Sequence, residues 1–222
     1  MGSPPKFSRL PRHVGLIPDG NRRWATERGL HAAEGYAAGL RVGLELLDEC
    51  HDIGIEEVSV YGFTMDNNKR PKLQRAAFST ACVKFVEMAM KRDISLRVVG
   101  DYTSAMFPEP LKEYALERKG TGKLKVNMLV NYGWNWDLQT AVCAQAASDT
   151  QRPFQELLAS ADVSRIDMVV RWGGMRRLSG FLPIQAVYAD FFVVDAYWPD
   201  FKPQQFYDSL EWYAKQDVTL GG

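Results

Sequence analysis

The stretch His13-Val-Gly-Leu-Ile-Pro-Asp-Gly-Asn-Arg-Arg-Trp24 decides the fold of this 222-residue chain. Its apolar run over residues 14–17 predicts a buried strand, and the pattern that resumes after Asn21 predicts a helix. The turn between them directs free backbone N–H groups and the positive end of a helix dipole toward one place. Asp19 is the one acid beside two arginines. This pattern is consistent with a divalent cation that joins the carboxylate to a bound phosphate, and a capped helix with solvated arginines is the simpler alternative.

The remainder of the chain alternates between predicted strands and predicted helices. Strands are predicted over residues 57–63, 94–99, 124–130, 167–171 and 191–195, and helices over residues 22–33, 34–53, 72–92, 111–119, 135–148, 181–189 and 203–215. No long polar linker or internal repeat interrupts this order. The sequence therefore predicts one α/β domain over residues 13–222, with a mostly parallel sheet, and an N-terminal extension over residues 1–12 that lies outside the fold.

The bulk composition excludes several classes of partner. Lys and Arg together number 27, as do Asp and Glu, so no overall positive field favours nucleic acid or an anionic membrane. No apolar run is long enough to span a bilayer, and the N-terminus lacks a signal-peptide core. We expect a cytoplasmic protein with no stable membrane association. The cysteines Cys50, Cys82 and Cys143 lie in apolar patterns and are expected to be buried, reduced thiols rather than a zinc site.

Four polar clusters follow predicted strands, at residues 19–23, 64–70, 131–133 and 171–179. The carboxyl ends of parallel strands share one edge of a sheet, so these clusters are expected to converge there. Their arginines outnumber their acids, which suits two multiply charged anions and one cation held by a carboxylate. Ordinary solvated loops are the alternative interpretation.

Several familiar signatures are absent from the sequence. The chain contains neither a G-x-x-x-x-G-K-[ST] loop nor a G-x-G-x-x-G fingerprint, so a nucleotide site lacks its strongest support. No Ser-His-Asp or Cys-His pairing is evident. A site with arginines, one acid and no nucleophile suits a ligand that ionises by itself, with apolar walls for a hydrocarbon tail or carbocation.

These segments resemble the cis-prenyltransferases, the undecaprenyl diphosphate synthase family. Residues 13–24 are similar to the family's H-V-x-x-I-M-D-G-N-G-R-W-A signature, and residues 61–71 to its Y-A-F-S-x-E-N-W-x-R-P segment. Residues 126–137 resemble L-N-x-A-x-N-Y-G-G-R-x-D, and residues 167–201 resemble the long segment from D-L-x-I-R-T-G-G-E to W-P-D-F. The resemblance implies the family fold, a six-stranded sheet surrounded by helices, which works as a homodimer with Mg²⁺.

The resemblance also implies roles for individual residues. Asp19 would hold Mg²⁺ on the diphosphate of an allylic donor, and Asp190 stands where the family has a Glu that reaches the partner subunit's metal. Further residues fall into four groups: the donor diphosphate site, Gly20, Asn21, Arg22 and Arg23; the acceptor diphosphate site, Arg171, Arg177 and Ser179; the catalytic groups besides Asp19, namely Asn67, Arg70 and Tyr36; and the apolar pocket, Trp24, Phe63, Phe78 and Phe85.

The departures from the family pattern lie mostly around the acceptor and the groups that would remove a proton. Arg22 replaces a Gly and Asn68 replaces a Trp. Ala32 replaces an Arg, Tyr36 a His and Met175 a Glu. Val218 and Thr219 stand where the family usually has two arginines. Loss of charge at a diphosphate pocket is costly, so these changes predict a rebuilt acceptor site. This pattern is most similar to the irregular lavandulyl and cyclolavandulyl diphosphate synthases.

Three functions remain open at this point. The first is Mg²⁺-dependent head-to-middle condensation of two molecules of dimethylallyl diphosphate to a ten-carbon diphosphate, with neryl or Z,E-farnesyl diphosphate synthesis from isopentenyl diphosphate as its regular counterpart. The second is a non-catalytic partner subunit, against which the retained Asp19 and Arg70 argue. The third is a nucleotide-binding domain, against which the missing fingerprints argue.

Overall fold

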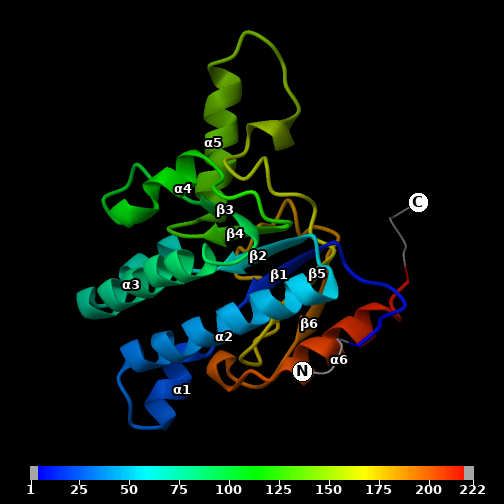
Figure 1. Ribbon diagram of the computed structural model, residues 1–222. Coiled ribbons are helices and arrows are strands. Elements are labelled where there is room, and N and C mark those ends of the chain that lie inside the picture. Colours follow the sequence, from blue (N-terminus) through cyan, green and yellow to red (C-terminus); the bar gives the residue numbers. More distant parts are fainter. Residues whose placement is uncertain (1–4, 218–222) are drawn as a thin grey trace.

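A computed structural model describes residues 5–217. Its centre is a six-stranded sheet in the order β3-β4-β2-β1-β5-β6, and every pair of neighbouring strands is parallel (Figure 1). The strands are β1 (His13–Ile17), β2 (Glu57–Tyr61), β3 (Ile94–Val99), β4 (Leu124–Leu129), β5 (Met168–Arg171) and β6 (Asp190–Val193). The α-helices are α1 (Asn21–Glu27), α2 (Ala32–Ile53), α3 (Lys72–Ala89), α4 (Lys112–Leu116), α5 (Trp134–Ala146) and α6 (Pro203–Tyr213). Short 3₁₀ helices are η1 (Met65–Lys69), η2 (Glu109–Leu111), η3 (Phe154–Leu157) and η4 (Trp198–Asp200).

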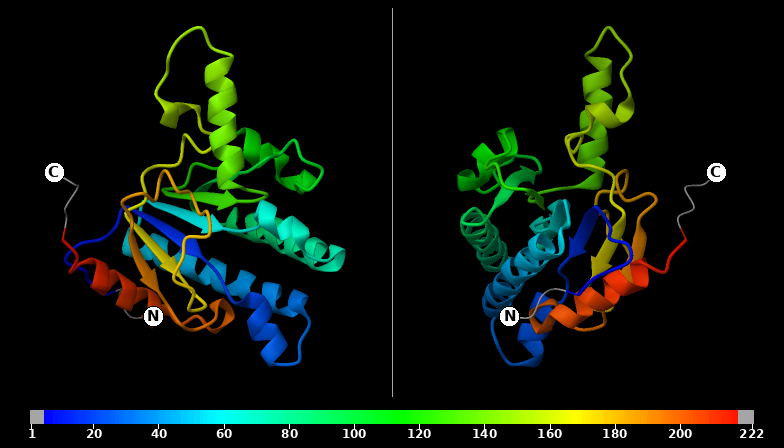
Figure 2. Two further views of the ribbon diagram at one scale, coloured as in Figure 1. Left: turned by 180° about the vertical axis from the view of Figure 1, so that it is seen from behind. Right: turned by 45° about the vertical axis from the view of Figure 1, so that its right-hand side comes forward.

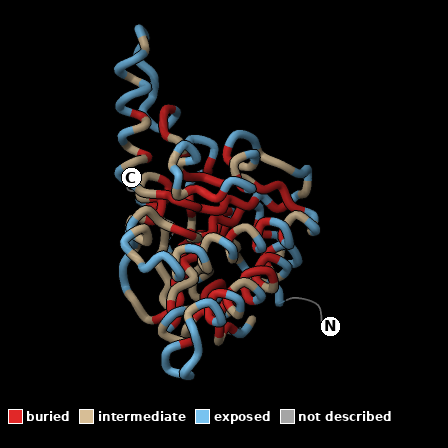
Figure 3. The backbone as a smooth tube through the Cα atoms, turned by 90° about the vertical axis from the view of Figure 1, so that its left-hand side faces the viewer, coloured by how far each residue is buried: buried red, intermediate tan, exposed pale blue. Residues whose placement is uncertain are grey.

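Helices α2, α3 and α6 cover one face of this sheet. They contribute buried side chains such as Leu46, Val86 and Phe206 to a core shared with alternate strand residues, among them Leu16 and Val58. The alternation arises because successive side chains of a strand point to opposite faces. Figure 3 shows that burial is concentrated in the strands and in the helix faces turned toward them.

Loops cover most of the other face, in place of a predicted helix. We predicted a helix over residues 181–189, and this prediction is wrong because the segment forms a series of turns. Within the segment Leu182 has a positive φ value, which a right-handed helix does not accept, and Ser179 and Gly180 immediately before it also have positive φ values. The segment is held instead by its core side chains Phe181 and Leu182, which are fully buried under the sheet.

Helix α5 projects beyond the body of the molecule (Figures 1 and 2). Its base is anchored by Asp137, which is buried and accepts hydrogen bonds from Tyr132 Oη at 2.9 Å and Ser160 Oγ at 2.6 Å. The outer part of α5 is exposed, and Cys143 lies there. Cys50 and Cys82 are buried free thiols as expected, whereas the prediction that Cys143 is buried was wrong. Among the described helices, none has the length and apolar character needed to cross a membrane.

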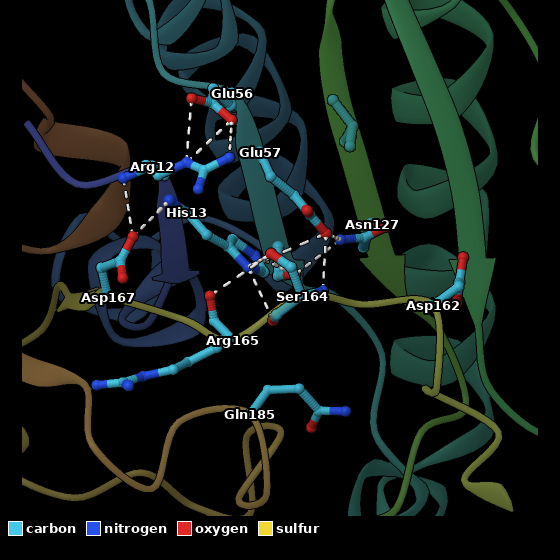
Figure 4. A network of polar contacts seen from close by, with 12 residues as sticks. Arg12, His13, Glu56, Glu57, Asn127, Asp162, Ser164, Arg165, Asp167 and Gln185 are labelled. Carbon is cyan, nitrogen blue, oxygen red and sulfur yellow. Dashed lines mark hydrogen bonds and ion pairs between the residues drawn. The ribbon is translucent and has the colours of Figure 1, made fainter. Parts of the chain in front are cut away.

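A network of polar side chains lies at the amino ends of the central strands (Figure 4). His13 is buried between Ser59, whose Oγ lies 2.9 Å from Nε2, and Ser164, whose Oγ lies 3.0 Å from Nδ1. The buried Glu57 carboxylate accepts a 2.6 Å hydrogen bond from Asn127 Nδ2. These contacts join β1, β2 and β4 at the edge of the sheet opposite the carboxyl ends.

Candidate active site

The site begins where the strand order reverses. From β1 the chain runs to β2 on one side, and from β5 it runs to β6 on the other, so the carboxyl ends of β1 and β5 flank the crevice in which open parallel sheets bind ligands. Asp19 follows β1, and Arg171 is the last residue of β5. Arg171 Nη2 donates to Asp19 Oδ2 at 2.7 Å. The sheet therefore brings together a carboxylate and a guanidinium that lie 152 positions apart in the sequence.

The turn from β1 into α1 is shaped by glycine and asparagine. Gly20 has a φ of 105°, a left-handed conformation that residues other than glycine rarely adopt. Asn21 Nδ2 donates to the carbonyl of Pro18 at 3.0 Å, and its buried Oδ1 has no hydrogen-bond partner within the described part of the chain. A Cβ added at Gly39 would lie 2.1 Å from that oxygen, so α2 needs a glycine there to pack against Asn21.

Arg23 is fixed on the inner side of α1. Its Nη2 lies 3.3 Å from Asp19 Oδ1 and donates to the carbonyl of Gly173 at 2.9 Å. Arg22 lines the same crevice with an exposed side chain. The first turn of α1 contains no acid, so Asp19 is the nearest compensating charge.

The opposite wall is formed by Tyr36, Arg70 and Phe78. The rings of Tyr36 and Phe78 stack with centroids 4.7 Å apart, and Arg70 Nη1 donates to the Tyr36 hydroxyl at 3.2 Å. The guanidinium carbon of Arg70 lies 5.7 Å from the Phe78 ring centroid, within the range of a cation–π contact. This wall therefore places a positive charge over the Phe78 ring and beside the Tyr36 hydroxyl.

These groups enclose a cavity of about 270 Å³ that continues into an apolar one of about 70 Å³. The larger cavity is lined by Asp19, Arg22, Arg23, Asn67, Arg70, Arg171 and Ser179, together with aromatic side chains. Tyr36, Tyr61 and Phe78 line both cavities. The apolar cavity extends from them to Cys82, Phe85, Met128 and Trp198. A polar chamber thus opens into a short hydrocarbon-lined extension.

Arg171 also organises the segment after β5. Its Nη1 donates to Ser179 Oγ at 2.9 Å and to the carbonyl of Arg177. The Tyr61 hydroxyl donates to the carbonyl of Ser179 at 2.9 Å. Burial raises the pKa of Tyr61, so its hydroxyl stays protonated and remains a donor. Arg171 is 4% exposed, and its buried Nε has no hydrogen-bond partner among the described residues.

The structure brings most of the predicted site residues together, with exceptions in the apolar pocket. Phe78 and Phe85 line the apolar cavity, as predicted. Trp24 does not, because its indole Nε1 donates to Asp200 at 2.7 Å on the outer side of α1. Phe63 is buried in the core and supports the Phe78 ring from behind, with centroids 5.6 Å apart.

Of the predicted acceptor and metal residues, too, some line the cavity and others do not. Ser179 and Arg171 line the cavity, but the exposed Arg177 contributes its carbonyl rather than its guanidinium. Asp190 begins β6 beside Met168, at the edge of the sheet opposite Asp19. Its predicted contact with a partner subunit's metal stays a prediction.

Of the substituted positions, Tyr36 lines the cavity, whereas Ala32 and Met175 do not. Val218 and Thr219 lie outside the described residues.

Sequence reasoning missed Tyr61 and Gly173 as parts of the site. Tyr61 was assigned only to a strand, although its place at the carboxyl end of β2 could have indicated it. The contact between the Gly173 carbonyl and Arg23 has no signal in the sequence. The cluster at residues 131–133 converges on the site indirectly, since the carbonyl of Tyr132 accepts from Met65 N at 2.9 Å and so supports η1.

The carboxylate of Asp19 fits a magnesium ion that a diphosphate would share. Mg²⁺ is typically held by one or two carboxylates and substrate phosphates, with the remaining positions taken by water. Asp19 faces the polar cavity with a 31% exposed side chain. Within residues 5–217 no cluster of three or more His, Cys, Asp or Glu side chains offers a closed protein cage. An ion at Asp19 would therefore depend on the ligand for most of its oxygens.

Comparison with known proteins agrees with this geometry. A family model described as "Putative undecaprenyl diphosphate synthase" matches residues 17–221. The chain belongs to this cis-prenyltransferase family. The farnesyl-diphosphate-specific ditrans,polycis-undecaprenyl-diphosphate synthase of Photorhabdus laumondii is 32% identical over 234 residues, which cover 97% of this chain and 91% of that protein. An isoprenyl transferase of Leptospira interrogans is 30% identical over 234 residues, covering 97% of this chain and 96% of the relative. Like its relatives in the family, the chain is a prenyltransferase enzyme.

The cis-prenyltransferase fold also appears in a solved plant structure. Lavandulyl diphosphate synthase from Lavandula x intermedia, in complex with dimethylallyl diphosphate, superposes with a TM-score of 0.84. The match covers 96% of this chain and 99% of the plant chain at 23% identity. It confirms the predicted single α/β domain with six parallel strands and surrounding helices.

Proposed function

We propose that this prenyltransferase joins two molecules of dimethylallyl diphosphate head to middle, with Mg²⁺, to give a ten-carbon branched diphosphate of the lavandulyl or cyclolavandulyl type. The observation that carries the proposal is the position of Tyr36. The family has a His there, and in this chain a phenol forms the cavity wall against Phe78 and accepts from Arg70. A phenol thus takes the place of a titratable imidazole in the cavity wall, while Asp19, Arg23 and Arg70, which we assign to the donor diphosphate, are retained.

The chemistry of the acceptor explains why such a change is needed. Isopentenyl diphosphate attacks with its terminal methylene, far from its own diphosphate. The double bond of dimethylallyl diphosphate is next to the carbon that carries the diphosphate, so the attacking carbon is two atoms closer to that charged group. The second diphosphate must therefore sit at a different depth, and the Tyr36 wall is where we place the difference.

Each of these residues would have a distinct role in the proposed reaction. Mg²⁺ held by Asp19 would supply neutralising charge on the donor diphosphate. The N–H groups at the start of α1, with Arg22, Arg23 and Arg70, bind the diphosphate oxygens and favour cleavage of the C1–O bond, whose electron pair leaves with the diphosphate. Arg171 and Ser179 hold the acceptor diphosphate, and Phe78 faces the hydrocarbon cation.

Product formation then needs one bond and one proton transfer. The π electrons of the acceptor form the new bond from its C2 to the donor C1, which leaves a tertiary cation. Loss of a proton from an adjacent methyl group restores a double bond, and the released diphosphate takes that proton. Tyr36 and Asn67 lie in the same cavity and can orient the diphosphate for this step. Reprotonation and ring closure would give the cyclic product.

The test is incubation with dimethylallyl diphosphate alone and Mg²⁺, followed by dephosphorylation and mass spectrometry of the alcohols. We expect a branched or cyclic ten-carbon alcohol without isopentenyl diphosphate. Formation of product only after isopentenyl diphosphate is added contradicts the proposal. The regular neryl or Z,E-farnesyl reaction would then stand.

A further inference from the structure

Tyr197, from the loop between β6 and η4, lies against the back of the turn that carries Asp19. A Cβ added at Gly20 would lie 2.6 Å from Tyr197 Cδ1 and 3.1 Å from its Cα. The next residue, Trp198, donates its backbone N–H to the carbonyl of Asp19 at 3.0 Å. The turn after β1 is therefore packed directly against a segment from the far end of the chain.

The same ring faces the guanidinium of Arg23. The Arg23 Cζ lies 5.0 Å from the Tyr197 ring centroid, within cation–π distance. Arg23 Nη2 is already committed to the carbonyl of Gly173, at 2.9 Å. Nε and Nη1 of Arg23 form no hydrogen bond with another residue of the range 5–217, so both N–H groups are left for a ligand in the cavity that this side chain lines.

Glu27 fixes the orientation of the Tyr197 ring. The Tyr197 hydroxyl donates to Glu27 Oε1, on the helical turn that follows Arg23 in α1. This hydrogen bond raises the pKa of Tyr197, which keeps the hydroxyl protonated as a donor. One tyrosine thus touches α1 at Arg23 and Glu27 and touches the turn at Gly20.

We propose that Tyr197 is a positioning residue, which holds Arg23 in the orientation that binds the donor diphosphate. This inference rests on the proposed donor role of the turn at residues 19–23. It extends that role to a loop whose residue has no contact with the ligand site, since Tyr197 does not line the cavity. An arginine side chain that rotates freely loses conformational entropy when it binds a ligand, which weakens binding. A side chain already held in the binding orientation avoids most of this entropy cost.

The experiment measures binding of inorganic diphosphate with Mg²⁺ by isothermal titration calorimetry, together with kcat and KM for dimethylallyl diphosphate. Tyr197→Leu removes the ring face, and we expect diphosphate binding about 3- to 30-fold weaker, with a matching rise in KM. Tyr197→Phe keeps the ring face and is expected to restore most of the affinity. Arg28→Gln is the matched control, because Arg28 lies 4.6 Å over the Trp24 ring near the end of α1 and does not line the cavity.

A double-mutant cycle separates positioning from a general structural role. In an Arg23→Gln background, Tyr197→Leu should weaken diphosphate binding no further, since its effect acts through Arg23. Should Tyr197→Leu fail to fold by circular dichroism, Tyr197→Met carries the same expectation. Equal loss of affinity in both backgrounds, or no loss in the wild-type background, overturns the inference while the proposed function stands. Absence of diphosphate binding by the wild-type protein overturns both.

Discussion

At the scale of single residues, Asp19 carries the most specific prediction. It faces the polar cavity and is paired with Arg171 and Arg23. Asp19→Asn preserves the shape of the side chain but removes the charge that would hold Mg²⁺ against the leaving diphosphate. We expect kcat to fall by about 10²–10³-fold or more, measured as diphosphate release under saturating Mg²⁺.

The matched control for this substitution is Asp195→Asn. Asp195 also pairs with an arginine, Arg176 at 3.6 Å, but its side chain is 81% exposed and lies outside the cavity. We expect this variant to retain wild-type turnover. Wild-type turnover in Asp19→Asn, with the fold verified by circular dichroism, would contradict the metal role.

His13 gives a pH prediction at the same scale. Burial lowers the pKa of His13, and the nearby Glu57 carboxylate only partly offsets this effect. As the pH falls through about 6.5, the unfolded chain therefore binds the proton before the folded one does. The stability contributed by neutral His13 is complete above that value and is lost as the pH falls toward the lower pKa of the folded state.

Urea unfolding between pH 7.5 and pH 5 measures this effect. The slope due to one such group is at most about 1.4 kcal/mol per pH unit. His13→Asn should be less stable at neutral pH, because it loses contacts to Ser59 and Ser164, but its stability should change less with pH. Identical slopes for wild type and His13→Asn would show that His13 is not the titrating group.

At the scale of elements, we predict that α3 limits the length of the product. Phe85 lines the apolar cavity, and it packs so closely on α2 that a Cβ at Gly43 would lie 2.9 Å from its ring. We expect the wild-type enzyme to make no polyprenyl products when given both five-carbon diphosphates. Phe85→Leu should deepen the cavity and allow longer donors or products, detected by thin-layer chromatography after dephosphorylation.

A second buried phenylalanine separates this effect from loss of stability. Phe206 of α6 is fully buried and lies outside both cavities, so Phe206→Leu should lower the melting temperature without altering product length. Polyprenyl products from the wild-type enzyme, or unchanged products from Phe85→Leu, would show that α3 does not set the limit.

At the scale of the whole molecule, the position of Asp190 makes a prediction about assembly. Asp190 lies at the amino ends of the parallel strands, and Asp19 follows their carboxyl ends. An Asp190 that binds the metal ion at Asp19 must therefore come from a second copy of the chain. In a homodimer, Asp19→Asn and Asp190→Asn would each inactivate both sites. A mixed dimer would contain one fully wild-type site.

Subunit mixing therefore tests this arrangement. Equal amounts of the two inactive variants, allowed to exchange subunits, should recover about a quarter of the wild-type activity, because half of the dimers are mixed and each has one intact site. Sedimentation velocity measures the assembly state in parallel. Full activity in Asp190→Asn alone, or no recovery on mixing, would contradict this role.

The sequence by itself determined the class of fold and the chemistry of the first turn. Alternating apolar runs and helical patterns predict a parallel α/β sheet because burial of apolar side chains must match the period of each element. The turn at residues 19–23 is local, so its Gly20, Asn21 and arginines could be identified without knowledge of the rest. The helix predicted over residues 181–189 is wrong because local backbone conformation outweighs the apolar pattern: Leu182 has a positive φ value, which a right-handed helix excludes.

The tertiary structure alone decided which distant groups meet. The order of the strands places Arg171 at 2.7 Å from Asp19, and the loop after β6 places Tyr197 beside Arg23. It also turned Trp24 outward to Asp200 and placed Tyr36 in the cavity wall. Periodicity states which face of an element is buried but not which neighbour it is buried against. That choice depends on packing summed over the whole sheet, and the cavity is where those packed elements leave space.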